Sequence, residues 1–319
     1  MDIFITVLEA VLVLVGIGAI GFWITRRGII PENILSFLSR LAIDIALPSL
    51  VFASIMVNFT PDEFPGWWQL PLWWFLFAGF SLVLTLITMF VSQKETRGEF
   101  GMNLFYQNGL FFPLIIISGV FGIDSIYLPQ LYIFIIIHPI MFFSTYQFFF
   151  RGGTQKTVQW SRIFNPILFA TFLAIIAQLF NGREHLPDFI QTILQIMGGM
   201  ALPLILIILG GSLYLDYKQK GKIYWREIGK FIVIKNIVYP LAYLGGLLLL
   251  RSYIDIGYEI ALLFILQSAV PPISGTPIMT ERAGGNKSIS NQFVFSSFIF
   301  SVISIPLMFW AFSQYFPQP

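Results

Sequence analysis

Two clusters of polar residues with glycine and proline interrupt long apolar stretches of this chain. Carboxamides and hydroxyls inside such stretches can hydrogen-bond a polar ligand, and glycine and proline there free backbone groups to do the same. The first cluster lies within residues 106–113 and the second within residues 267–277. The candidate ligand-binding residues of the two clusters are Gln107, Asn108, Gly109, Pro113, Gln267, Ser268, Pro271, Pro272 and Ser274.

Both clusters predict interrupted helices. Proline removes a backbone donor and clashes with the preceding turn, so Pro271, Pro272 and Pro277 with Gly275 should end one helix and allow another to begin. Unwound backbone at membrane depth is tolerated only where protein buries it or a watery cavity receives it. If the two breaks meet, the helix N-termini that follow would present free N–H groups and positive dipole ends, which favours an anion, most simply a carboxylate.

Two titratable residues could move a coupling ion. Asp44 is the deepest acidic residue and could carry a proton or ligate a cation, or it could form a structural ion pair with Arg40 one turn earlier. His138, next to Pro139, could relay protons or could simply pack inside the protein. Lys235 lies near the start of an apolar segment, and we expect its side chain to reach the cytoplasmic interface.

The composition of the chain is that of a membrane protein. Hydrophobic residues make up 57% of the 319 residues and charged residues only 11%, and the mean hydropathy is +0.81. A soluble domain would carry about a quarter charged residues. There are no cysteines and two histidines, and hydrolase, zinc-protease and P-loop motifs are missing. We therefore expect no enzyme activity, no metal or other cofactor and no nucleic-acid partner, with H⁺ or Na⁺ as the possible coupling ion.

The apolar stretches predict an all-α integral membrane protein in the lipid bilayer of the plasma membrane. The sequence predicts ten transmembrane helices, which are residues 3–25, 33–57, 68–92, 100–120, 126–150, 163–180, 187–214, 229–250, 256–280 and 290–314. Nearly all loop lysines and arginines fall on one side, with only Arg183 and Arg251 on the other. The basic side should be cytoplasmic, which places both termini outside the cytoplasm.

The two halves of the chain resemble each other. Pro31 leads to Ala46-Leu47-Pro48, and Pro187 leads to Ala201-Leu202-Pro203 over nearly the same distance. We predict a first five-helix repeat at 1–150, a cytoplasmic linker at 151–162 and a second five-helix repeat at 163–319. Because five is odd, the second repeat is inverted. The fourth and ninth spans, which hold the two polar clusters, then correspond, and paired interruptions of this kind point to a transport site.

These segments resemble the auxin efflux carrier family in its bacterial branch. The resemblance rests on the two Ala-Leu-Pro segments, on Leu209-Gly210-Gly211-Ser212-Leu213, on the stretch from Ser268 to Gly285, which includes the run 279–285, and on the final-helix pattern at 296–307. It implies a 5+5 inverted repeat with two broken, crossing helices, a scaffold domain and a transport domain, an elevator mechanism and a homodimer. It also implies small organic acids as substrates.

Position by position, the resemblance places the crossover prolines on Pro113 and on Pro271 or Pro272. Where the family has an asparagine in the fourth span this chain has Tyr106, and Phe111 replaces the usual glycine, which implies a bulkier and more aromatic pocket. We expect a secondary transporter or facilitator of a small organic anion. The alternatives are a sodium-coupled carrier like the bile acid symporters, which share the crossed-helix plan, and a membrane ligand sensor that does not transport.

Overall fold

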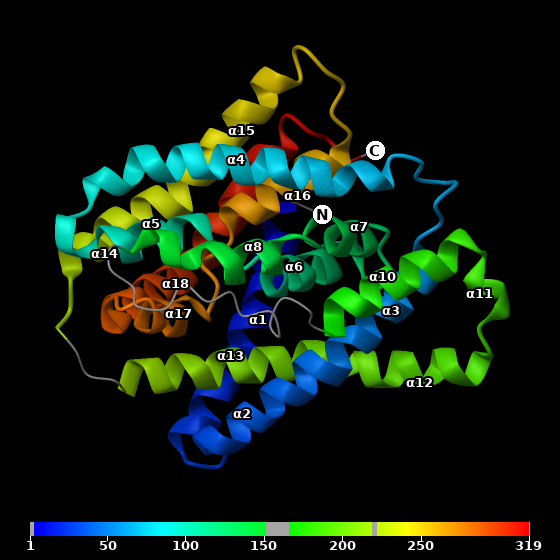
Figure 1. The fold of residues 1–319 in the computed structure, drawn as a ribbon, viewed down its shortest axis with the longest axis horizontal. Coiled ribbons are helices and arrows are strands. Elements are labelled where there is room, and N and C mark those ends of the chain that lie inside the picture. The colour runs from blue at the N-terminus through cyan, green and yellow to red at the C-terminus, as the bar shows by residue number, and fades with distance from the viewer. Residues whose placement is uncertain (1–2, 151–165, 219–221, 319) are drawn as a thin grey trace.

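The computed structural model describes residues 3–150, 166–218 and 222–318, and these residues form helices packed against one another (Figure 1). We describe the helices as two bundles, which contact each other. The predicted linker at 151–162 lies outside the described residues. Seven helical segments are long and apolar enough to cross a membrane, and three shorter apolar helices accompany them in the described part. The all-helical membrane fold agrees with the prediction. The count of ten spans and the inversion of the repeat stay predictions.

The first bundle takes its helices from the start of each half of the chain. In it, α1 packs against α13, while α3 packs against α10 and α12, and α12 and α13 follow one another along the lower edge of the view in Figure 1. A π-helical turn at Ala42–Ala46 joins α2 to α3. The helices are α1 (Ile3–Arg26), α2 (Glu32–Leu41), α3 (Leu47–Asn58), α10 (Pro166–Leu179), the short α11 (Gly182–His185), α12 (Asp188–Gly199) and α13 (Ala201–Lys218).

The second bundle takes the remaining helices of each half. Its centre is α18, which packs against α5, α14, α16 and α17. A π-helical turn at Ile234–Val238 joins α14 to α15, and 3-10 turns lie at Trp67–Gln69, Met89–Val91, Lys94–Thr96 and Tyr146–Phe149. The helices are α4 (Leu70–Thr88), α5 (Arg97–Phe105), α6 (Phe111–Phe121), α7 (Tyr127–Phe134), α8 (His138–Thr145), α14 (Trp225–Val233), α15 (Tyr239–Leu250), α16 (Tyr258–Ala269), α17 (Thr276–Arg282) and α18 (Lys287–Ser313).

Glycines allow α1 and α13 to approach closely in the first bundle. A Cβ added to Gly210 would collide with the carbonyl oxygen of Gly18, and one added to Gly21 would collide with the backbone of Ile207. Small residues let membrane helices bring their backbones together where burial of apolar surface gives little drive to associate. The first bundle is therefore held by tight backbone packing between the two halves of the chain.

One sequence expectation needs correction in the second bundle, and one predicted span has a break that was not expected. The predicted span 126–150 is present as the apolar segment Tyr127–Phe149, but α7 ends at Phe134 and α8 begins only at His138. Pro139 explains this, since it lacks the N–H that a continuous helix would bond to Ile135. Lys235 does not reach the cytoplasmic interface: it is 1% exposed, and its Nζ lies 5.3 Å from the centre of the Tyr239 ring.

Candidate functional site

The two predicted interruptions are present, and they touch. Residues 106–110 separate α5 from α6, and residues 270–275 separate α16 from α17; we call these two segments the junction. The Asn108 N–H donates to the Pro271 carbonyl at 2.8 Å, and the Ile273 N–H donates to the Tyr106 carbonyl at 3.1 Å. Gln107 and Pro272 pair as an antiparallel bridge. Backbone groups freed by the two breaks thus satisfy one another in the protein interior, as burial requires.

Two glutamine side chains reinforce the junction. Gln267 Nε2 donates to the Gly109 carbonyl at 2.7 Å, and Gln107 Nε2 donates to Gln267 Oε1 at 3.2 Å. Both glutamines are buried, Gln267 completely. A Cβ on Gly109 would lie 2.5 Å from Gln267 Oε1, so the absence of a side chain there is what lets the carboxamide reach the backbone. The sequence-predicted residues from Gln107 to Gly109 and from Gln267 to Pro272 therefore meet in one place.

One N–H group at each of the two helix starts at the junction has a partner within the protein. Asn108 Oδ1 accepts the Phe111 N–H at 3.2 Å, so the side chain caps α6. The Thr276 N–H at the start of α17 donates to the Ile273 carbonyl at 3.0 Å. These two N–H groups are bonded within the protein and are not presented to a ligand. Pro113 is buried in the first turn of α6, as expected of a residue that costs no donor there.

The two predicted serines contribute less to the junction. The Ser268 hydroxyl is buried and donates to the Ile265 carbonyl of its own helix at 2.9 Å. Ser274 is half-buried in the segment between α16 and α17, and no hydrogen bond of its side chain occurs among the described residues. Ser268 therefore stabilises the end of α16, while the Ser274 hydroxyl makes no hydrogen bond to the described residues.

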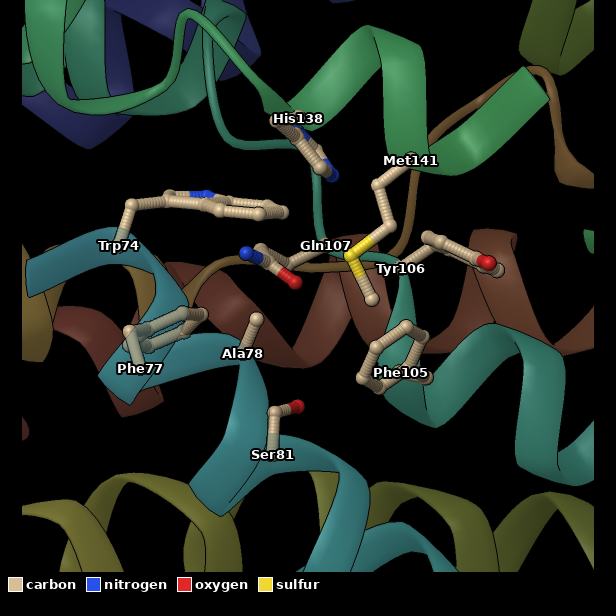
Figure 2. Close-up of a pocket in the computed structure, with 9 residues that line it drawn as sticks. All are labelled: Trp74, Phe77, Ala78, Ser81, Phe105, Tyr106, Gln107, His138 and Met141. Carbon is tan, nitrogen blue, oxygen red and sulfur yellow. The ribbon is translucent and has the colours of Figure 1, made fainter. Parts of the chain in front are cut away.

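A pocket opens beside the junction, and Gln107 lies in its wall. Side chains of α4, α5 and α8 surround it, with Trp74, His138 and Met141 close around Gln107 in Figure 2. The pocket is narrow, with a volume of about 10 Å³. Its lining residues are Trp74, Phe77, Ala78, Ser81, Phe105, Tyr106, Gln107, His138 and Met141. Four aromatic side chains line this pocket besides His138. One of them is Tyr106, which stands where the family has an asparagine and which implied a more aromatic pocket.

His138 stands where α7 gives way to α8 and lines the wall of this pocket. Its side chain is 7% exposed, and its Nε2 is a buried atom with no hydrogen-bond partner in the described structure. The imidazole lies 5.8 Å from the Trp74 ring, centre to centre. The position that a Cβ on Gly109 would occupy is 3.2 Å from His138 Nδ1. The histidine is therefore part of the site and has an unused nitrogen there.

A second, larger pocket lies on the other side of His138. It has a volume of about 80 Å³, and α10 of the first bundle supplies Ile167, Leu168 and Thr171 to its wall. The remaining lining residues come from the second bundle and are Leu110, Tyr132, Ile135, Ile136, His138 and Pro139. His138 thus borders both the junction and the boundary between the bundles.

Asp44 lies away from the junction. It sits in the π-helical turn that precedes α3. This turn packs against α10, α12 and α13 of the first bundle. Asp44 and Arg40 are both exposed, and the ion pairs found in the described part of the chain do not include them. Asp44 lines neither pocket. The two candidate coupling residues therefore belong to different bundles, and only His138 touches the junction.

A buried polar network fixes the helices on one side of the junction. Asn103 on α5 accepts the Thr276 hydroxyl of α17 at 2.6 Å and donates to the Ser290 hydroxyl of α18 at 2.8 Å. Thr280 donates to the same Ser290 hydroxyl at 3.2 Å. All four side chains are fully buried. Because unmade hydrogen bonds are costly at this depth, the network holds α5 and α17 in a fixed relation to α18.

Sequence reasoning did not find Trp74 or Met141. Trp74 is one of four tryptophans between residues 67 and 74, and Met141 is one apolar residue among many. The helical spacing from His138 to Met141 places both on one face of α8. That spacing is the one local signal that could have associated Met141 with the site.

Comparison with known proteins provides independent evidence on the class of the chain. A family described as membrane transport protein matches residues 6–159 and again residues 153–309. An uncharacterized transporter of Methanocaldococcus jannaschii is 23% identical over 311 residues, which cover 95% of this chain and 98% of that protein.

Proposed function

The chain belongs to the auxin efflux carrier family of membrane transport proteins, and from this premise we propose that it is a secondary carrier of a small organic anion. Two matches of the family that together span most of the chain support transport over enzyme activity. The single structural observation behind the proposed site is the pocket beside the junction, to which the first interrupted segment contributes Tyr106 and Gln107. The polar groups of both segments meet at the junction itself, next to this pocket.

The substrate class follows from the lining of the pocket. Gln107 offers a carboxamide, and the buried indole N–H of Trp74 has no hydrogen-bond partner among the described residues. Aromatic and aliphatic side chains form the remainder of the wall, which suits an apolar body with one polar end. Donors facing an otherwise apolar pocket favour a carboxylate, which only accepts hydrogen bonds.

The second pocket supports movement of one bundle against the other. Its wall combines α10 of the first bundle with α7, α8 and Leu110 of the second, so the two surfaces meet there without filling the space. We assign the first bundle the role of scaffold and the second that of moving transport domain, as in an elevator mechanism. Because the first bundle is tightly packed through glycines, it is suited to remain still.

A thermal-shift screen of the purified protein tests the site. Benzoate, indole-3-acetate, malonate, malate and sodium chloride are the probes. We expect at least one carboxylate to raise the melting temperature, and its affinity to fall about tenfold or more in Gln107→Leu, because a hydrogen bond to a charged group contributes roughly 1.5–3 kcal/mol.

Gln195→Leu provides the matched control, since Gln195 is exposed on α12 of the first bundle, and it should bind like the unaltered protein. Stabilisation by sodium chloride alone would instead favour the sodium-coupled carrier. A carboxylate that binds Gln107→Leu and the unaltered protein equally would contradict the proposed site.

A further inference from the structure

His138 is the one histidine, and the one group able to become a cation near neutral pH, in the walls of the two pockets. The other titratable side chains lining them are Tyr106 and Tyr132. Helices α4, α6, α7, α8 and α10, which surround the pockets, contain no Asp, Glu, Lys or Arg. This environment supplies His138 with neither a counter-ion nor a competing charge.

The charges that the neighbouring helices do carry lie at a distance or have partners. Glu259 on α16 is eight residues before Gln267, which is about 12 Å along the helix. Glu99 on α5 accepts the Asn286 N–H at 2.6 Å, and the guanidinium of Arg97 lies over the Phe90 ring at 4.7 Å. Within the described residues no three or more His, Asp or Glu side chains gather as a metal site would need.

An isolated imidazolium in this buried, largely apolar pocket would have a high free energy, and so would an isolated carboxylate. Burying an unpaired charge costs several kcal/mol or more, whereas a close opposite charge offsets that cost. His138 Nε2 is buried and unpartnered, in a wall that also holds the unpartnered Trp74 N–H. A carboxylate entering beside Gln107 would supply the missing anion, and a proton on His138 would supply the missing cation.

We propose that His138 takes up one proton when a carboxylate binds at the junction, so that proton and anion cross the membrane together as a symport. The inference rests on the proposed function. The proton comes from water on the side where the anion enters, resides on the imidazole as an imidazolium–carboxylate pair, and returns to water on the other side when the anion leaves. For a monocarboxylate the transported unit then has no net charge.

If proton uptake by His138 is linked to carboxylate binding, the affinity for the carboxylate depends on pH. A histidine that only packs inside the protein would not cause this dependence. If His138 is neutral in the free protein and protonated in the complex, the dissociation constant for benzoate rises about tenfold for each pH unit between the pKa of His138 in the free protein and its pKa in the complex. The measurement therefore covers the range from about pH 6 to about pH 9, in which benzoate stays ionised because carboxylic acids titrate near pH 4. If benzoate produces no thermal shift, malonate replaces it as the probe.

The chain provides its own control, because it contains two histidines. His138→Gln should bind more weakly and lose the pH slope, while His185→Gln should keep both affinity and slope, since His185 is exposed at the end of α11. Proton uptake from weakly buffered solution, measured on the unaltered protein, should be one proton per bound benzoate. That measurement does not depend on the folding of any variant.

The outcomes separate the two proposals. A flat pH profile or no proton uptake in the unaltered protein, with benzoate or malonate bound, overturns the role of His138 and leaves the carrier intact. An unchanged slope in His138→Gln overturns it as well. If none of the four carboxylates of the thermal-shift screen binds at any pH, the proposed function fails, and this inference fails with it.

Discussion

Gly109 sets how closely the two interrupted segments can approach. Its carbonyl accepts the Gln267 carboxamide, and the space that a side chain would need lies 2.5 Å from Gln267 Oε1 and 3.2 Å from His138 Nδ1. The first of these separations is one that Cβ contacts do not show. A side chain at this position would therefore have to displace the end of the Gln267 carboxamide, and no unusual backbone angle adds to the need for glycine.

Gly109→Ala should displace Gln267 and loosen the junction. We expect a loss of about 1–3 kcal/mol in the free energy of unfolding, as for other overpacked sites, together with weaker carboxylate binding. Thermal unfolding in detergent measures the first effect and the ligand-induced shift measures the second. Gly245→Ala is the control, because nothing lies within 4 Å of the added Cβ. Equal behaviour of the two variants would mean that the junction tolerates a side chain.

Residue chemistry in the sequence identified the polar residues of the junction and two of the nine residues that line its pocket, Gln107 and His138. Gln107, Asn108 and Gln267 were conspicuous because carboxamides are rare in apolar stretches, and the structure brings them together. Their partners could not be read from the sequence. Gln107 pairs with Gln267 across 160 positions, and the capping role of Asn108 depends on where α6 begins. Trp74 enters the site only through the packing of α4 against α5 and α7.

At the scale of elements, the interruptions were predictable and the ties between helices were not. Glycine and proline act locally, so the ends of α5 and α16 could be inferred from the chain. The break between α7 and α8 carries only one such signal, Pro139, and was missed. The network from Asn103 to Thr276 and Ser290 was missed. Asn103 is a carboxamide in an apolar stretch, but its partners are of types that often bond to their own helix.

Asn103→Leu tests whether α5 and α17 are tied as a unit. The substitution leaves the buried hydroxyls of Thr276 and Ser290 without this partner, which should cost roughly 1–3 kcal/mol. We expect a lower melting temperature and weaker carboxylate binding, although Asn103 lines neither pocket. Asn33→Leu, an exposed position on α2, should leave both unchanged. Normal binding in Asn103→Leu would show that the junction holds without the network.

At the scale of the whole molecule, the two bundles do not coincide with the two halves of the sequence. Each bundle combines helices from before and after residue 150, and α1 of the first bundle packs against α6 and α18 of the second. Repeat matching could place the halves, but it could not show how they interleave. This arrangement is why the junction forms between residues far apart in the chain and why the second pocket lies between bundles.

The orientation predicted from loop charges can be tested directly, because the chain contains no cysteine. A single cysteine replacing the exposed Gln314 should react with a membrane-impermeant maleimide in intact cells. One replacing the exposed Lys94 should react only after permeabilisation, since the basic side faces the cytoplasm. The reverse pattern would overturn the orientation without affecting the fold.

The proposed carrier function requires that an anion crosses the bilayer through the junction. Uptake of radiolabelled carboxylate, chosen as the acid that stabilises the purified protein most, into proteoliposomes measures this directly. We expect uptake well above protein-free liposomes, reduced about tenfold or more in Gln107→Leu and unchanged in Gln195→Leu. A protein that binds the acid in detergent but gives no uptake above protein-free liposomes would contradict the carrier and favour a membrane ligand sensor.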